Sequence, residues 1–214
     1  MSKSSTIHTD DGMVRRAVRQ LLAERHADDD AVVVEELRAA RGSARMDLAV
    51  VNGRLSGVEI KSDRDRLGRL KRQADLFSLA ADRMTLVVGR VHHAAAVAMV
   101  PDWWGIMLAT AGENGNVRLK TVRPGRLNRA TDSGALVRLL EREELVALLE
   151  WHGLDRGFRT APYAHLVEKL VSSLSRPTIS DGVRRLIKAR ARIEKAQNLT
   201  AFGKSAIICR PPSV

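Results

Sequence analysis

Cysteine, aromatic side chains and long apolar runs are all scarce in this chain of 214 residues. The single cysteine, Cys209, excludes a disulfide framework and any zinc site built on several cysteines. It also favours the reducing cytoplasm as the compartment. No stretch approaches the roughly 18 uninterrupted apolar residues of a membrane-spanning helix, so we expect no membrane partner. With only seven aromatic residues available for bulk, we expect Trp103 or Trp104 to fill the core.

Positive charge is in excess, and it is unevenly distributed. The formal net charge is +11, from 36 Lys and Arg against 25 Asp and Glu. Residues 1–150 hold 24 basic and 21 acidic side chains, whereas residues 151–214 hold 12 and 4. A basic segment on a nearly neutral body indicates a polyanionic partner, most often nucleic acid. Charge alone leaves a solubilising surface as the alternative.

Hydrophobic periodicity predicts an α/β core followed by helices. Asn52-Gly53 is typical of a type I′ turn, so residues 46–61 are predicted to form a β-hairpin. The other expected strands lie near 31–34, 84–89, 106–110 and 117–122, with Glu35 and Glu36 closing the first of these. The expected helices lie near 13–26, 67–81, 92–100, 135–152, 162–175 and 179–198.

These patterns divide the chain into four segments. We predict a disordered lead-in at 1–12, a core at 13–122, a linker at 123–134 and a basic helical domain at 135–214. The predicted fold class is therefore α/β, with a mixed central sheet flanked by helices and an all-α C-terminal extension.

Three charged residues fall within the predicted hairpin, on strands that are otherwise apolar. Glu59 and Lys61 are two residues apart and so share one face of their strand, while Ile60 points into the core. Asp47 lies near the start of the preceding strand, and the hairpin brings it opposite Glu59 and Lys61. We therefore expect two carboxylates and an ammonium group to converge at one edge of the sheet.

A cluster of three charges needs compensation, because burying an unpaired charge is costly. Two carboxylates and water suit Mg²⁺, with Mn²⁺ as a substitute, and a nearby lysine can stabilise negative charge that develops on a phosphate. This equipment serves phosphodiester hydrolysis. The alternative is an ordinary cross-strand ion pair on a solvated face, because Asp, Glu and Lys at this spacing are common.

The motifs R-M-D-L-A-V-V and G-V-E-I-K-S-D, followed by a helix with R-L-x-x-Q-A-D-L-F, resemble the PD-(D/E)xK nuclease superfamily, which has a restriction-endonuclease-like fold. The resemblance implies that Asp47 and Glu59 bind the metal ion, together with the Ile60 carbonyl, and that Lys61 is the catalytic lysine. It also implies a supporting acidic residue, for which we choose Glu36 with Glu35 as the alternative. Gln73 matches a glutamine that supports the site in part of the superfamily.

A second resemblance extends further along the chain. V-P-D-W-W-G after a strand ending V-V-G is similar to a little-characterised group of bacterial and phage proteins that have this core and a helical C-terminal extension. One feature departs from the superfamily pattern, since Met46 stands where its name-giving proline would be. The resemblance covers about residues 13–110 and implies nothing about residues 130–214.

Basic residues lie near the predicted site and in the last predicted helix. We expect seven of them to contact nucleic acid: Arg45, Arg64, Arg69, Arg72, Arg184, Lys188 and Arg192. Of these, Arg184, Lys188 and Arg192 recur every four residues and so share one helix face. The alternatives are solvated helix faces and, for the last helix, a module that makes the protein a homodimer.

The sequence thus predicts a cytoplasmic, Mg²⁺-dependent nuclease that acts on DNA. A protein that keeps the nuclease fold and binds nucleic acid or another protein without cutting is the first alternative. Cleavage of RNA is the second. The joint presence of Asp47, Glu59 and Lys61 favours an enzyme, because a binding protein does not need this combination.

Overall fold

The computed structural model describes residues 7–27, 30–39, 42–112 and 114–208. In this part of the chain, six strands form one mixed sheet in the order β1 to β6. The strands are β1 (Val32–Ala39), β2 (Ala44–Val51), β3 (Leu55–Lys61), β4 (Arg83–Gly89), β5 (Gly105–Ala111) and β6 (Val117–Arg123). The first three form an antiparallel meander, β3, β4 and β5 are parallel, and β6 returns antiparallel to β5.

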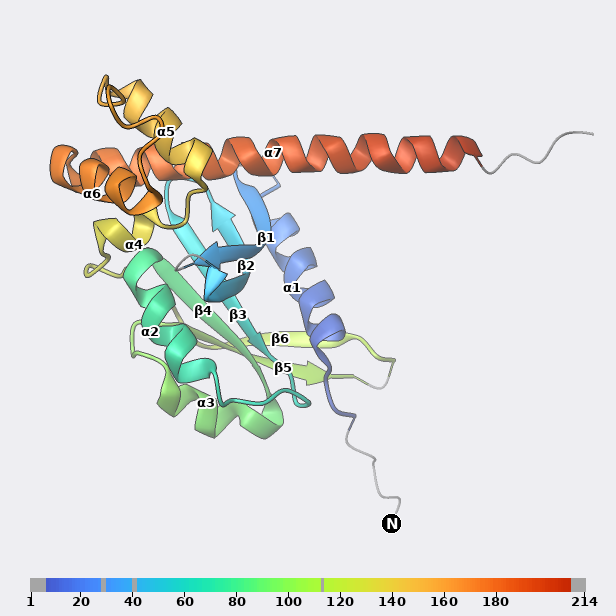
Figure 1. The fold of residues 1–214 in the computed structure, drawn as a ribbon. Coiled ribbons are helices and arrows are strands. Elements are labelled where there is room, and N and C mark those ends of the chain that lie inside the picture. Colours follow the sequence, from blue (N-terminus) through green and yellow to red (C-terminus); the bar gives the residue numbers. More distant parts are fainter. Residues whose placement is uncertain (1–6, 28–29, 40–41, 113, 209–214) are drawn as a thin grey trace, which may run out of the picture.

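Helices cover both faces of the sheet and gather at one end of it (Figure 1). They are α1 (Asp11–Arg25), α2 (Leu70–Ala80), α3 (His93–Met99), α4 (Ser133–Val137), α5 (Arg142–Trp151), α6 (Tyr163–Ser173) and α7 (Arg176–Ile208), with a 3₁₀ turn η2 (Arg90–His92) before α3. α2 connects parallel strands β3 and β4, as such crossovers require. The predicted fold class, a mixed sheet flanked by helices with more helices at the C-terminus, is confirmed.

The core has one layer on each face of the sheet. On one face, Val14, Val18 and Leu22 of α1 recur at helical spacing and pack on the sheet, where alternate residues such as Val58 and Ile60 meet them. On the other face, α2 and the C-terminal helices share one hydrophobic cluster with the remaining strand residues. Trp104 is fully buried in that second cluster, as expected for one of the two neighbouring tryptophans.

The C-terminal helices complete the second layer of the core. Leu136, Leu148, Leu170 and Ile187 come from four different helices, and all are buried in the cluster that contains Phe77 of α2. α7 crosses the end of the sheet beside β1 and β2 (Figure 1). None of the helices in the described part of the chain is both long and apolar enough to cross a membrane.

The predicted hairpin forms, but its turn differs from the prediction. Val51 pairs with Leu55, so three residues connect the strands. Neither Asn52 nor Gly53 has a positive φ, which a type I′ turn requires at both central positions. The Asn52 side chain instead accepts a hydrogen bond from the Arg54 amide at 3.0 Å, and this bond stabilises the longer loop.

The first strand is longer than predicted, because backbone pairing continues beyond its apolar residues. β1 runs to Ala39, which pairs with Ala44, so Glu35 and Glu36 lie inside the strand. Glu36 has φ of 51°, in the left-handed region that non-glycine residues seldom adopt.

Residues 7–12 of the predicted lead-in belong to the fold, while residues 1–6 lie outside the described residues. Thr9 is fully buried, and Asp10 caps α1 by accepting a hydrogen bond from the Met13 amide at 2.9 Å. The predicted linker is also anchored. Asn128 is buried, and its side-chain amide donates to the carbonyl groups of Ser78 and Ala81.

Candidate active site

The candidate site lies where β2 and β3 separate. The two strands pair from Val51 and Leu55 as far as Leu48 and Val58, and the ladder ends there. Asp47 and Glu59 are the next residues on either side of this opening. The divergence leaves backbone groups of β3 without a partner on β2, and such groups need another partner when they are buried.

The Asp47 carboxylate fills the opening between the strands. Its Oδ2 accepts a hydrogen bond from the Ile60 amide at 2.7 Å, which replaces the missing ladder bond. Its Oδ1 accepts from Arg15 Nη2 at 3.0 Å, and Arg15 Nη1 also donates to the Asp47 carbonyl at 3.2 Å. The amide and carbonyl of one strand residue lie on the same side of the strand. The Ile60 carbonyl is therefore directed toward Asp47 as well.

Glu59 and Lys61 point to the opposite face, toward α2, and they form a buried ion pair. Glu59 is 0% exposed, Lys61 is 8% exposed, and Lys61 Nζ lies 2.5 Å from Glu59 Oε1. Gln73 of α2 lies beside Glu59, and its amide favours the charged carboxylate. Among the described residues, Glu59 Oε2 and Gln73 Oε1 are buried without a hydrogen-bond partner. A buried carboxylate oxygen of this kind needs a hydrogen-bond or metal partner, which a water, an ion or a ligand can supply.

Both carboxylates of the cluster bind a proton more readily than exposed acids do. Burial and the nearby Asp47 carboxylate together raise the pKa of Glu59 to about 7, against the opposing effects of Lys61 and Gln73. Burial also raises the pKa of Asp47 above its ordinary value, although the Ile60 amide, Arg15 and Lys61 oppose this. Two neighbouring acids with raised pKa values indicate a site prepared for added positive charge.

The donor set fits Mg²⁺ or Mn²⁺ in part. The Asp47 carboxylate and the Ile60 carbonyl offer hard oxygen donors in the opening between the strands. The Glu59 carboxylate lies near Asp47 on the α2 face, and its Oε2 is uncommitted among the described residues. Mg²⁺ usually keeps several waters and takes one or two protein carboxylates, and two carboxylates are available here. No group of three or more His, Cys, Asp or Glu side chains that could hold a metal occurs among the described residues.

Glu36 and Glu35, one of which was expected to support the two carboxylates, both form ion pairs with arginines at the surface. Glu36 lies across from Asp47 on β1, but its side chain is half exposed and forms an ion pair with Arg45 at 2.8 Å. Glu35 pairs with Arg19 of α1 at the surface. The left-handed backbone at Glu36 accompanies this outward placement. Arg45 is held by the same pair and is 56% exposed.

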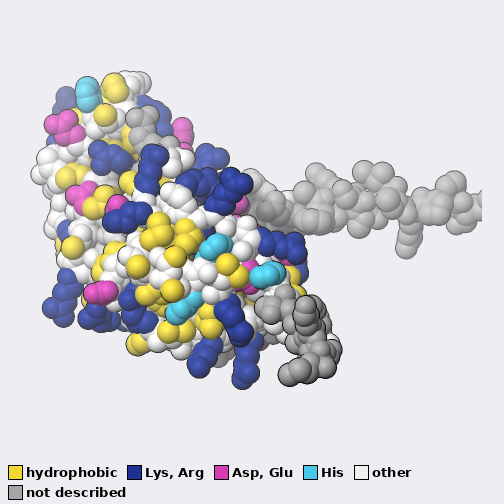
Figure 2. Space-filling view, turned by 90° about the horizontal axis from the view of Figure 1, so that it is seen from below, with side chains coloured by type: hydrophobic (Ala, Val, Ile, Leu, Met, Phe, Trp, Pro, Cys, Tyr) yellow, Lys and Arg dark blue, Asp and Glu magenta, His cyan; other side chains and the backbone are white. Residues whose placement is uncertain are grey.

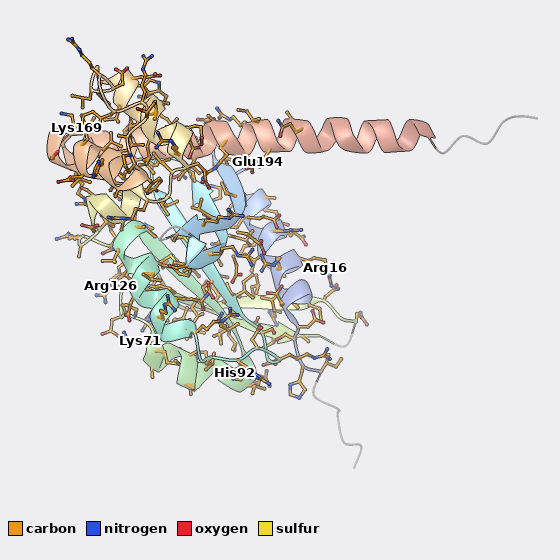
Figure 3. The ribbon with its side chains drawn as sticks, viewed as in Figure 1. Arg16, Lys71, His92, Arg126, Lys169 and Glu194 are labelled. Carbon is orange, nitrogen blue, oxygen red and sulfur yellow. The ribbon has the colours of Figure 1, made fainter. Side chains whose placement is uncertain are left out.

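The arginines predicted to hold phosphate near the site are at the surface around the start of α2. Arg64, Arg69 and Arg72 are exposed, and no ion pair connects them to another described residue. Lys71 of α2 and Arg16 of α1 lie on opposite sides of the sheet (Figure 3). The end of the molecule away from α7 shows many Lys and Arg side chains around a group of apolar and His side chains (Figure 2).

The basic residues of the last helix are not at the candidate site. Arg184 and Lys188 lie beside the β2–β3 loop, at the start of β3, whereas Lys61 is at its other end. Lys188 and Arg192 form ion pairs with Asp30. The structure therefore separates the predicted nucleic-acid contacts into two groups, one near Lys61 and one on α7.

Arg15 belongs to the site, and sequence reasoning missed it. Its guanidinium connects Asp47 with Asp11, which lies one helical turn earlier on α1. The sequence signal was weak, because a basic residue four positions after an acidic one usually indicates an exposed helix pair. Its contact with β2 depends on how α1 packs on the sheet.

Comparison with known proteins indicates the family of the chain. The family model described as bacteriophage P4 protein cII matches residues 11–210. Protein cII of Enterobacteria phage P4 is 30% identical over 177 residues, which make up 83% of this chain and 66% of the phage protein. The chain thus spans just under two thirds of that relative. No solved structure matches the chain.

Proposed function

The chain belongs to the family of bacteriophage P4 protein cII, and we propose that it is a metal-dependent nuclease that hydrolyses phosphodiester bonds in DNA. The observation that carries this proposal is the buried Glu59–Lys61 pair beside Asp47, with Glu59 Oε2 unpartnered among the described residues. Burying these charged groups costs desolvation free energy. Fold stability alone does not account for them, because buried ion pairs seldom stabilise a fold more than apolar residues would.

Each side chain of the cluster has a role in this proposal. Asp47, Glu59 and the Ile60 carbonyl would hold Mg²⁺, or Mn²⁺ in its place. That ion supplies charge neutralisation and a more acidic bound water. Arg15 and the Ile60 amide orient the Asp47 carboxylate, and Gln73 orients Glu59. Lys61 provides a fixed positive charge for the phosphate oxygen that gains charge during the reaction.

A non-catalytic nucleic-acid-binding protein is the second candidate, and one observation favours it. Asp47 pairs with Arg15, and Glu59 pairs with Lys61, so two negative and two positive groups balance without any metal. The uncommitted Glu59 Oε2 weighs against this candidate, because a fully satisfied structural cluster would leave no buried carboxylate oxygen without a partner.

The test is a cleavage assay with a panel of substrates. The purified protein is incubated with circular single-stranded DNA, linear duplex DNA and RNA, each with Mg²⁺, with Mn²⁺ and with chelator. We expect metal-dependent cleavage of DNA that is lost in Glu59→Gln, which keeps the size of the side chain. Cleavage of RNA alone would correct the substrate. Intact substrate under every condition would reject the nuclease and favour the binding protein.

A further inference from the structure

A basic groove lies at the end of the sheet that faces α7. It has a volume of about 1080 Å³ and lies between α7, the β2–β3 loop and the start of β4. Its basic side chains are Arg54, Arg83, Arg184 and Lys188, which come from three separate parts of the chain. A second hollow beside it extends the same surface along α7 to Arg185 and Arg192.

The two arginines on the sheet side of the groove form no ion pair with another described residue. Arg54 and Arg83 are both exposed, and neither side chain has a partner among the described residues. Asp82 lies between them in the groove lining, but its Oδ2 accepts a hydrogen bond from the Leu55 amide at 2.8 Å. Asp82 thus connects the starts of β3 and β4, and it leaves the two guanidinium groups available.

On the α7 side of the groove, one described loop residue forms ion pairs with basic side chains of the helix. Arg184 donates to Ser180 at 2.6 Å and is 4.0 Å from Asp181, which leaves part of its donor fork open. Lys188 Nζ lies 2.9 Å from Asp30 Oδ2, and Arg192 pairs with the other oxygen of Asp30. The Asp30 side chain is 76% exposed, so this anion rests on the surface of the helix and is not built into the core.

We propose that this groove binds the phosphate backbone of a nucleic acid, and that Asp30 occupies the position of a phosphate until the nucleic acid displaces it. The proposal rests on the nucleic-acid substrate of the proposed function, and it names a binding surface remote from the carboxylates. Guanidinium groups present forked donors that match phosphate oxygens, and three of the four basic groups in the groove are arginines.

The length of β3 separates this groove from the candidate active site. Leu55 to Lys61 spans six residue steps, or about 20 Å. A duplex rises about 3.4 Å per base pair, so contact with both regions needs about six base pairs. The groove therefore contributes affinity and not chemistry, and its effect is measurable with chelator present.

The experiment measures binding of the full chain to a fluorescent 20-base-pair duplex in chelator, between 50 and 200 mM salt. The test variant is Arg83→Gln, Arg184→Gln. We expect its salt slope to fall by about two, because each lost phosphate contact removes about 0.9 from the slope. The matched control is Arg118→Gln, Lys120→Gln, which removes two exposed charges from edge strand β6 at the far side of the sheet.

A third variant tests the role of Asp30. Asp30→Asn removes the competing anion from Lys188 and Arg192, so we expect it to bind the duplex several-fold more tightly. An unchanged or weaker affinity of this variant for the duplex would show that Asp30 does not compete with phosphate for Lys188 and Arg192. If the salt slope fell equally in the test and control variants, or in neither of them, the groove would not be the nucleic-acid-binding surface. Tighter binding of polyglutamate than of DNA would reassign the groove to an acidic protein.

These outcomes are separable from a failure of the proposed function. Groove-dependent binding without cleavage under any metal condition would reject the nuclease and leave the groove supported. Cleavage with full activity and an unchanged salt slope in Arg83→Gln, Arg184→Gln would reject the groove and leave the nuclease supported.

Discussion

Lys61 is the residue that most directly separates catalysis from binding. Its ammonium group is almost fully buried and contacts Glu59. In the proposed nuclease it would act on charge that appears only in the transition state, so its loss would lower rate more than affinity. We expect Lys61→Met, which keeps the bulk of the side chain, to reduce single-turnover cleavage about 10²- to 10³-fold with little change in DNA affinity.

The matched control for Lys61→Met is Lys71→Met. Lys71 is 63% exposed on α2 and pairs with Asp75 in a surface contact that contributes little. Loss of the Lys71 charge should leave the cleavage rate within about a factor of two of the wild-type rate. Full cleavage activity in Lys61→Met would reject the role given to this residue.

Metal binding tests Asp47 and Glu59 together. We expect Asp47→Asn, Glu59→Gln to abolish binding of Mn²⁺ measured by calorimetry, because both anionic donors become neutral amides. The asparagine still offers an oxygen to the Ile60 amide, so the fold should persist, as circular dichroism would verify. Mn²⁺ binding of the same affinity in this double variant would show that neither carboxylate holds the metal ion.

Glu59 also gives stability a definite pH dependence. Its folded-state pKa of about 7 lies above the ordinary value of 4.5, so the folded state holds this proton more tightly than the unfolded state does. The contribution of Glu59 protonation to the free energy of unfolding is fully present below pH 4.5. It is lost as pH rises through 7. The loss by pH 8 is on the order of 3 kcal/mol.

Urea unfolding in chelator at pH 5 and pH 8 measures this dependence. Wild type should lose stability over the interval relative to Glu59→Gln, whose amide does not titrate. Parallel pH profiles for the two proteins would show that the Glu59 carboxyl is charged throughout.

At the level of elements, one aspartate connects three segments that surround the site. Asp63 follows β3, and its Oδ2 accepts hydrogen bonds from the amide and hydroxyl of Thr9, each at 2.8 Å. Its Oδ1 accepts from the Val91 amide at 2.9 Å. A Cβ at Gly89 would lie 2.6 Å from the Asp63 amide, so glycine allows this close approach. The β3–α2 loop is thereby fixed directly after Lys61.

We expect Asp63→Ala to destabilise the fold by about 1–3 kcal/mol, because it leaves the amide and hydroxyl donors of buried Thr9 without their carboxylate acceptor. Hydrogen exchange should accelerate first in the segment before α1 and in the turn after β4. Asp75→Ala is the control, since Asp75 is 58% exposed and contacts only the Lys71 side chain among the described residues. Uniform acceleration across all strands would show that the contact is not local.

The sequence predicts patterns within a single helix or strand well. It predicts contacts between these elements less well. The apolar spacing of Val14, Val18 and Leu22 predicted α1, and the residues around Asn52-Gly53 predicted the hairpin. The turn type was wrong because Asn52 makes its own side-chain bond to the loop. The end of β1 was wrong because backbone pairing with β2 holds two glutamates in the strand.

In the candidate site, too, features within the hairpin were predictable from the sequence, whereas contacts with other elements were not. Strand alternation and the hairpin together predicted that Asp47, Glu59 and Lys61 would lie near one another. Gln73, which only the resemblance to the nuclease superfamily suggested, lies beside Glu59. Arg15 could not be predicted, because its contact requires the packing of α1 on β2. The role of Glu36 stays a prediction. Its side chain is half exposed and pairs with Arg45, and its backbone is left-handed, neither of which the sequence indicated.

At the scale of the whole molecule, the C-terminal helices and the sheet share one core. Leu148 of α5 is fully buried in the same hydrophobic cluster as Phe77 of α2 and Met84 of β4. A Cβ on Gly182 of α7 would lie 2.4 Å from Leu148 Cδ1, so α5 and α7 are in close contact there. Cutting the chain after residue 132 would therefore expose one side of the second core layer to water.

Shared packing predicts that the sheet and the C-terminal helices unfold together. We expect Leu148→Ala to destabilise the protein by about 2–5 kcal/mol, as typical for a buried leucine. In a Trp151→Phe background, tryptophan fluorescence comes from Trp103 and Trp104, which directly precede β5 and report on the sheet layer. Circular dichroism reports chiefly on the helices. In urea both signals should follow one transition, which the substitution shifts as a whole. If the helical signal alone were shifted, the C-terminal helices would be an independent domain, and the basic groove between α7 and the sheet would open without unfolding the candidate active site.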